Sequence, residues 1–241
     1  MHNSKKSSTF AVAMTILCIE TSTAVCSGAI VKDGELVEQC LCSEGGNHAR
    51  LLPQYMEQLL QTAKRQGLTI DAVALSEGPG SYTGLRIGTS TAKGLCYGLN
   101  VPLIPVPTLD VLNAASGATG HLCPMIDARR MEVYTSIMVN GEWMNGEGAR
   151  AVVVENEDSL YAGEEDVYYF GDGAEKCSKV FTKPNWHYIP GIVPEARFVG
   201  IIGERLAVSG ERLVESKELA YYEPYYLKEF IAAQSHVKGL L

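Results

Sequence analysis

The sequence predicts a two-lobed α/β protein with mixed sheets flanked by helices, and three observations carry this prediction. The 241 residues are 46% hydrophobic, enough for a sizeable core. Short apolar runs open the chain, and amphipathic helices then alternate with strands. A reduced set of similar segments follows. We therefore expect a first lobe over residues 14–110 and a smaller lobe over 111–241, whose C-terminal segment can return to the first lobe.

The elements of the first lobe follow from hydrophobic patterning and turn signals. Asp33-Gly34 is a two-residue hairpin signal, and Gly67 ends a helix with a broad apolar face. Seven elements are expected: strands over 15–20, 24–31 and 35–42, a helix around 51–63, a strand over 70–75, a glycine-rich turn with a helix, and a strand over 101–106. This order, three antiparallel strands and then alternating helices and strands, is the half-domain layout of ribonuclease-H-like and actin-like folds.

The second lobe shows fewer and shorter elements of the same kinds. We expect a helix from residue 108, strands over 123–128, 132–143, 150–155 and 167–170, and an amphipathic helix over 194–209. The remainder is rich in tyrosine and is expected to be irregular.

The most informative segment is SEGPGSYTGLRIGTSTAKGLCYGL, residues 76–99. Its glycine-rich turn exposes amide groups at a helix start, where an anion can bind, although the spacing fits neither GxxxxGK[ST] nor GxGxxG. The helix behind it carries the glycine pairs Gly84/Gly88 and Gly94/Gly98. Each helical glycine costs roughly 1 kcal/mol relative to alanine. We expect close approach of a second helix to compensate.

A second polar turn follows the first strand, and in an actin-like half-domain it lies near the glycine-rich turn. The two turns are either vestigial phosphate loops or ordinary polar turns, and Arg86 serves either the loop or a structural ion pair. The candidate cofactor-binding residues are Glu20, Thr21, Ser22, Gly78, Gly80, Ser81, Thr83 and Arg86.

Other reactive side chains predict no catalytic and no metal site. The seven cysteines include no CxxC pair and mostly lie in apolar runs, so we expect structural burial. Neither HxxxH nor HExxH occurs, and His48 is interpreted as a polar cap or a solvated residue. The charged turn of residues 127–134 either positions a substrate or a neighbouring subunit, or pairs its own charges at the surface.

Composition narrows the class of protein further. The net charge of −8 disfavours a free-standing nucleic-acid binder. No apolar run reaches the ~18 residues of a spanning helix, and no export signal is evident. We expect a cytoplasmic protein that does not associate with membranes. Residues 1–13 are expected to be a disordered leader.

Four segments together resemble the TsaB (YeaZ) family of the bacterial tRNA threonylcarbamoyladenosine system: ILCIETSTAVCSGAI, NHARLLPQYMEQLL, ALSEGPGSYTGLRIGTSTAKGLCYGLNVPLIPVPTLD and PMIDARRMEVY. The similarity runs from about residue 14 to the end. It implies an actin-like, non-catalytic scaffold that binds no cofactor alone and pairs with a TsaD-type catalytic subunit. ATP and metal are then expected on partner subunits, including a TsaE-type ATPase, and tRNA is reached only through the complex. A homodimer is the other pairing that the family implies.

The resemblance also implies that the two apolar helices form the subunit interface, with part of their apolar face exposed in the monomer. The interface residues expected are Leu51, Leu52, Tyr55, Met56, Leu59, Gly84, Gly88 and Ala92. The chain departs from catalytic relatives in lacking their HxxxH pair, and it has Glu20 where Asp is usual, which weakens direct magnesium and phosphate binding. The competing class is an enzyme, either an actin-fold ATP-dependent kinase or a glycoprotease-like protein.

Overall fold

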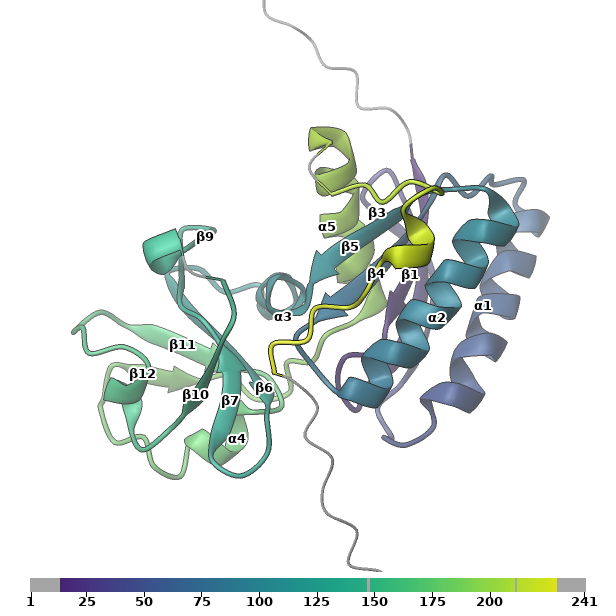
Figure 1. Ribbon diagram of the computed structural model, residues 1–241. Coiled ribbons are helices and arrows are strands. Elements are labelled where there is room, and N and C mark those ends of the chain that lie inside the picture. The colour runs from purple at the N-terminus through teal and green to yellow at the C-terminus, as the bar shows by residue number, and fades with distance from the viewer. Residues whose placement is uncertain (1–13, 147, 211, 229–241) are drawn as a thin grey trace, which may run out of the picture.

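The computed structural model describes residues 14–146, 148–210 and 212–228, which form two lobes that each contain a β-sheet (Figure 1). The predicted α/β class with two sheets flanked by helices is confirmed. The leader expected over residues 1–13 lies outside the described residues.

The first lobe contains a five-stranded sheet in the order β3-β2-β1-β4-β5. Its strands are β1 (Thr15–Glu20), β2 (Cys26–Lys32), β3 (Glu35–Cys42), β4 (Ala72–Gly78) and β5 (Leu103–Pro107). The first three strands pair antiparallel, while β4 and β5 continue the sheet in parallel with β1. The hairpin predicted at Asp33-Gly34 is confirmed, because both residues have positive φ, at 52° and 76°.

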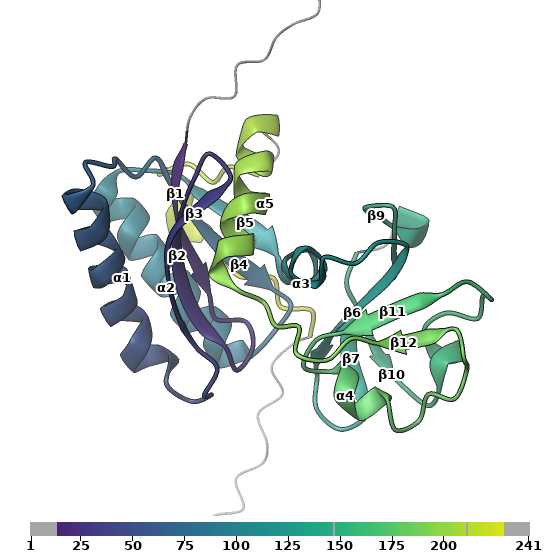
Figure 2. The same ribbon diagram turned by 180° about the vertical axis from the view of Figure 1, so that it is seen from behind.

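Helices cover both faces of this sheet (Figures 1 and 2). They are α1 (His48–Arg65) and α2 (Tyr82–Leu99) on one face, and α3 (Thr108–Ser116) and α5 (Ala196–Ser209) on the other. Alternate residues of β1 serve the two cores: Leu17 packs with the α1 and α2 residues, and Ile16 with those of α5. The expected lobe boundary at residue 110 falls within α3, which also packs against the second sheet.

The second lobe contains a seven-stranded sheet of mostly short strands in the order β10-β7-β6-β11-β12, with β8 paired to β6 and β9 paired to β8. Its elements are β6 (His121–Asp127), β7 (Glu132–Thr135), β8 (Met138–Val139), β9 (Glu142–Trp143), β10 (Arg150–Val153), β11 (Val167–Phe170), α4 (Ala174–Cys177) and β12 (Trp186–Tyr188). An aromatic cluster that includes Tyr169, Phe181 and Trp186 fills its core.

The single strand expected over residues 132–143 is wrong. The structure divides it into β7, β8 and β9. Asn140 and Gly141 have φ of 51° and 86°, so that they turn β8 back onto β9. Asn-Gly is a strong two-residue turn signal, and the apolar run before it masked that signal. Strand β12 was also not predicted.

The segment after α5 returns across the first lobe. Val214 and Leu103 exchange backbone hydrogen bonds at 2.9 and 3.0 Å, which adds a bridge at the free edge of β5. Leu219 is buried in the core beneath α1 and α2, and Tyr225 N donates to Glu77 O at 2.8 Å. This segment therefore belongs to the first lobe, and it ends beside the glycine-rich turn (Figure 1).

Candidate functional site

The two predicted loops meet at one end of the first sheet. Ser81 N donates to Ser22 O at 2.6 Å, and Thr21 Oγ1 donates to Gly84 O at 2.9 Å. Because β1 and β4 are adjacent and parallel, the loops that follow the two strands leave the sheet at the same end. The loop proximity expected from the half-domain layout is therefore present.

The contact between the two loops occupies the backbone amide and the space beside the glycines that a phosphate would need. The Ser81 amide already has the Ser22 carbonyl as its acceptor. A Cβ at Gly80 would lie 2.3 Å from Ser22 O, and one at Gly84 would lie 2.0 Å from Thr21 O. The glycines at these positions let the backbone after β1 approach the start of α2. Their role in the structure is therefore packing of one loop against the other.

Glu20 lies at the centre of this contact and is fully buried. Its Oε1 atom accepts hydrogen bonds from Ser22 N and Ser22 Oγ, both at 2.6 Å, while Oε2 has no partner among the described residues. Burial raises the pKa of the Glu20 carboxyl, and the Ser22 hydrogen bonds offset part of this effect. The environment thus favours the protonated form of this side chain.

The start of α2 is covered by the returning C-terminal segment. Arg86, the predicted cation of the loop, stacks its guanidinium over the Tyr82 ring at 4.4 Å and donates from Nε to Tyr226 Oη at 3.3 Å. A Cβ at Gly78 would lie 2.4 Å from Tyr225 O. Thr83 is exposed on the first turn of the helix. The cation is thus directed to tyrosines of the same chain.

The charged turn of the second lobe has ion pairs with other elements. Lys176 pairs with Asp127, and Lys228 of the C-terminal segment pairs with Glu132. Asp172 was not predicted as a site residue, and its Oδ1 accepts from Asp127 N at 3.0 Å. It lies in the glycine-containing turn GDGAEK, residues 171–176, and the pairing of β11 with β6 brings this turn to Asp127.

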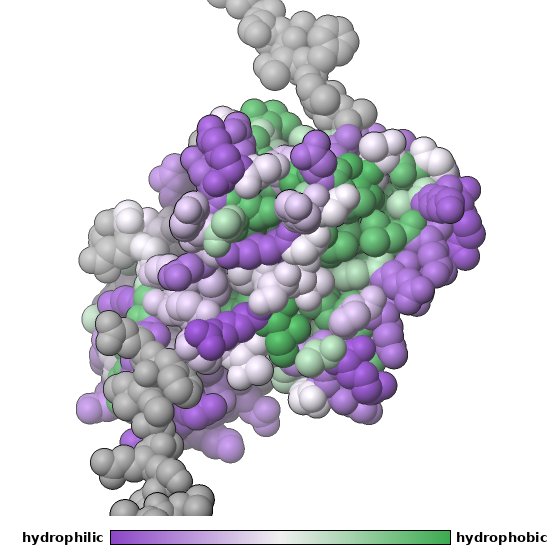
Figure 3. Space-filling view, turned by 45° about the vertical axis from the view of Figure 1, so that its right-hand side comes forward, coloured by the Kyte–Doolittle hydropathy of each residue, from purple (hydrophilic) through white to green (hydrophobic). Residues whose placement is uncertain are grey.

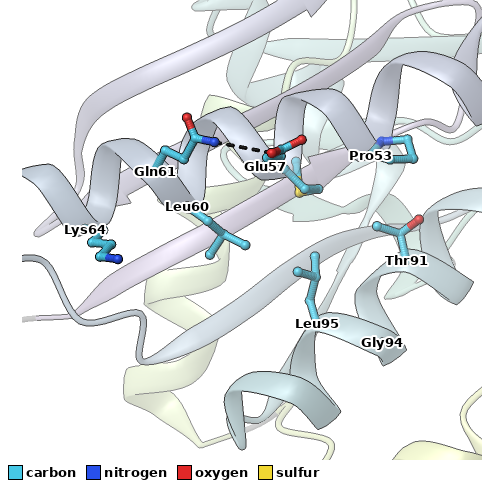
Figure 4. Close-up of a pocket in the computed structure, with 9 residues that line it drawn as sticks. Pro53, Glu57, Leu60, Gln61, Lys64, Thr91, Gly94 and Leu95 are labelled. Carbon is cyan, nitrogen blue, oxygen red and sulfur yellow. Dashed lines mark hydrogen bonds between the residues drawn. The ribbon is translucent and has the colours of Figure 1, made fainter.

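The second feature is an apolar groove between α1 and α2, called the α1–α2 groove below. Its lining residues are Pro53, Met56, Glu57, Leu60, Gln61, Lys64, Thr91, Gly94 and Leu95. Its volume is about 530 Å³. Leu60 and Leu95 point toward one another from the two helices, and the Glu57–Gln61 hydrogen bond lies on the α1 rim (Figure 4). Hydrophobic residues gather on this side of the molecule beside a hydrophilic margin (Figure 3). The groove can accept an apolar side chain or helix from another molecule.

Six of the eight predicted interface residues are buried within the chain, although one of them, Met56, also lines the α1–α2 groove. Those buried within the chain are Leu52, Met56, Leu59, Gly84, Gly88 and Ala92. They lie on the inner faces of the helices: the Met56 methyl occupies the space above Gly28 of β2, and Gly88 abuts Thr21. Leu51 and Tyr55 are half-buried. Leu60, Thr91 and Leu95 were not predicted as interface residues, although helical periodicity places them on the outer face with Gly94, which was expected to allow close approach of a second helix.

The remaining side chains singled out in the sequence have structural positions. His48 Nε2 lies 3.1 Å from Val25 O and ties the start of α1 to the sheet. All seven cysteines are free thiols, and six are buried, as predicted. Within the described ranges no group of three His, Cys, Asp or Glu side chains could hold a metal ion. None of the helices in those ranges combines the length and apolar character needed to cross a bilayer.

Comparison with known proteins assigns the family. The family model for TsaD, tRNA N6-adenosine threonylcarbamoyltransferase, matches residues 44–190. The tRNA threonylcarbamoyladenosine biosynthesis protein TsaB of Escherichia coli is 31% identical over 91% of this chain and 96% of that protein. TsaB of Haemophilus influenzae is 35% identical over 52% of this chain, and that alignment spans about half of the relative, 54%. The solved structure of YeaZ from Pseudomonas aeruginosa covers 89% of this chain and superposes with a TM-score of 0.72 at 25% identity. The chain therefore belongs to the TsaB (YeaZ) family.

Proposed function

We propose that this chain serves in the formation of threonylcarbamoyladenosine in tRNA as a non-catalytic subunit that pairs with a TsaD-type catalytic subunit. The single observation that carries the proposal is the α1–α2 groove, an open apolar surface on a chain with TsaB relatives. The pairing proposed is between related folds, because the TsaD family model itself matches this chain over residues 44–190.

The groove suits the helices of a related subunit. A Cβ added at Gly94 would have no atom within 4 Å, so a partner side chain can approach the α2 backbone there. Tyr97, which is 86% exposed, lies three residues after Gly94 on the same helix. Tyrosine and leucine flanked by polar residues are typical of an interface core with a polar rim. A partner that presents its own α1- and α2-like helices would complete a helical bundle across the interface.

The division of labour rests on what the loops already bind. The Ser81 amide and the space at Gly80 are taken by the backbone of Ser22, and Glu20 buries an acidic side chain that accepts from Ser22 beside this contact. We propose that ATP and metal are held by partner subunits, including a TsaE-type ATPase, and that tRNA is reached only through the complex. The net charge of −8 agrees with this, because the chain alone repels a polyanion.

The central test is association of the Leu60→Glu variant with its TsaD-type partner. A charge in the α1–α2 groove should weaken binding by about 100-fold in titration calorimetry, because changing a residue at the centre of an interface commonly reduces the binding free energy by that amount. Gln54→Glu is the control, since Gln54 is exposed on α1 outside the groove. Unchanged affinity of Leu60→Glu, with an unchanged circular dichroism spectrum, would refute the proposed surface. Loss of self-association with intact partner binding would assign the groove to a homodimer instead.

The non-catalytic role has a separate test. ATP with magnesium, titrated into the isolated chain, should give no saturable binding up to about 1 mM, a concentration typical of weak substrate sites. Threonylcarbamoyladenosine formation should then require this chain together with TsaD- and TsaE-type subunits, threonine, bicarbonate and ATP. Micromolar ATP affinity of the isolated chain would favour the actin-fold kinase alternative.

A further inference from the structure

A second hollow lies between the two lobes, on the side of the first sheet opposite the α1–α2 groove. It is lined by α3 and α5 of the first lobe and by β6, β8 and β9 of the second. Its volume of about 610 Å³ is within the range of small-molecule sites, roughly 300–1,000 Å³. Figure 1 shows α3 between the two sheets, with β9 on one side and α5 on the other. We call this hollow the interlobe cavity.

Two buried acceptor oxygens at the interlobe cavity lack donors. Asn113 is 8% exposed, and its Nδ2 donates to Met138 Sδ at 3.1 Å, which leaves Oδ1 without a partner among the described residues. Asp110, one helical turn earlier on α3, likewise has a buried Oδ1 without a partner there. A buried acceptor that lacks a donor is destabilising, and native structures rarely leave one unexplained. Each oxygen has less than 1 Å² of exposed surface, so its side chain must turn toward the cavity before a ligand can donate to it.

The charged groups of the interlobe cavity are separated and unpaired within the described residues. Asp110 supplies a carboxylate from α3, and Arg205 supplies an exposed guanidinium from α5. Neither forms an ion pair among residues 14–146, 148–210 and 212–228, whereas the neighbouring Arg212 is committed to Glu77. Apolar side chains of Leu122, Met138 and Trp143 line the second-lobe wall. The cavity thus presents one negative group, one positive group and an apolar wall.

We propose that the interlobe cavity binds a small zwitterion with an apolar body, of the size of an amino acid. Its ammonium group would donate to the Asp110 and Asn113 oxygens, its carboxylate would accept from Arg205, and its side chain would lie against Met138 and Trp143. Ammonium and guanidinium groups paired with carboxylates make the stronger, charge-assisted hydrogen bonds. The proposal is independent of subunit pairing, because every group lies within one chain and outside the α1–α2 groove.

The chemistry of the ligand can be tested without changing the protein. Titration calorimetry with leucine and phenylalanine should give saturable binding. N-acetylleucine and leucinamide should each bind at least tenfold more weakly than leucine. N-acetylation removes the ammonium group and amidation removes the carboxylate, so each compound tests one end of the site. No saturable binding of either amino acid up to about 10 mM, well above ordinary small-ligand affinities, would overturn the proposal. Binding of both blocked compounds with the affinity of leucine would also overturn it.

Variants of the protein assign the two ends. Asp110→Asn and Arg205→Met should each weaken leucine binding at least tenfold, whereas Arg65→Met, at the end of α1, should leave it unchanged. Asp110→Asn should no longer discriminate leucine from N-acetylleucine, and Arg205→Met should no longer discriminate leucine from leucinamide. Variants that keep the wild-type far-UV circular dichroism spectrum but lose leucine binding without these changes in discrimination would contradict the assignment. Binding of leucine should also raise the unfolding midpoint with ligand concentration.

Discussion

Gly84 and Gly94 lie on the same helix, and the structure uses them in opposite ways. Gly84 is buried, and a Cβ there would lie 2.0 Å from the Thr21 carbonyl, whereas Gly94 has open space and lines the α1–α2 groove. Helix α1 shows the same division, since Leu52 is fully buried and Leu60 faces the groove. A small residue in a helix can therefore serve an internal backbone contact or leave room for a partner. The side of the helix on which it lies decides between the two.

The largest effect is expected from Met56→Asp. The change places a carboxylate among the buried apolar side chains beneath α1 and should destabilise the fold by about 4 kcal/mol. Urea unfolding of the monomer measures this loss. Met56→Leu, which conserves volume, should lose less than about 1.5 kcal/mol. A stable Met56→Asp monomer that only fails to pair would show that Met56 belongs to the interface.

A smaller loss is expected from Gly84→Ala. The added methyl group must displace the Thr21 backbone, because no flexible side chain can move out of its way, and overpacking of this kind costs roughly 1–3 kcal/mol. Chemical denaturation compares the variant with Gly94→Ala, which has the same composition. Equal stability of the two variants would contradict the internal role assigned to Gly84.

Gly94→Ala should raise stability by up to about 1 kcal/mol, because alanine is the better helix former and its methyl group meets no atom. The same methyl group enters the α1–α2 groove and should weaken partner binding. Gly98→Ala provides the matched control, since Gly98 is also open but does not line the groove. If both variants bind the partner equally well, the groove is not the contact surface at this position.

The smallest effect is a change in the pH dependence of stability on Glu20→Gln. Burial raises the pKa of Glu20 in the folded chain above its unfolded value of about 4.3, so the folded state binds the proton more tightly. The resulting stability is fully present below the unfolded pKa and is lost as pH rises through the folded pKa. Gln keeps a neutral side chain and the acceptor for Ser22, so stability of the variant should fall less between pH 4 and pH 7 than that of the wild type. Parallel pH profiles of the two proteins, from thermal unfolding, would contradict the buried-carboxyl assignment.

Strands were most predictable where local signals agree. The expected strands at residues 15–20, 35–42 and 167–170 match β1, β3 and β11 at both ends, because apolar runs there stop at turn residues. The prediction failed at 132–143, where the apolar pattern was weighted above the Asn140-Gly141 turn. It also missed β12, a strand of three residues whose pairing with β11 is a long-range contact.

The sequence by itself determined the two-lobed α/β architecture, the family and the meeting of the loops after β1 and β4, because strand order follows from local patterning. Only the tertiary structure decided which face of α1 and α2 is covered. Periodicity shows that a helix has an apolar stripe, but how much of that stripe a sheet buries depends on packing between elements far apart in the chain. The same reason explains the interlobe cavity, since Asp110, Asn113 and Arg205 come together only when α5 returns to the first lobe.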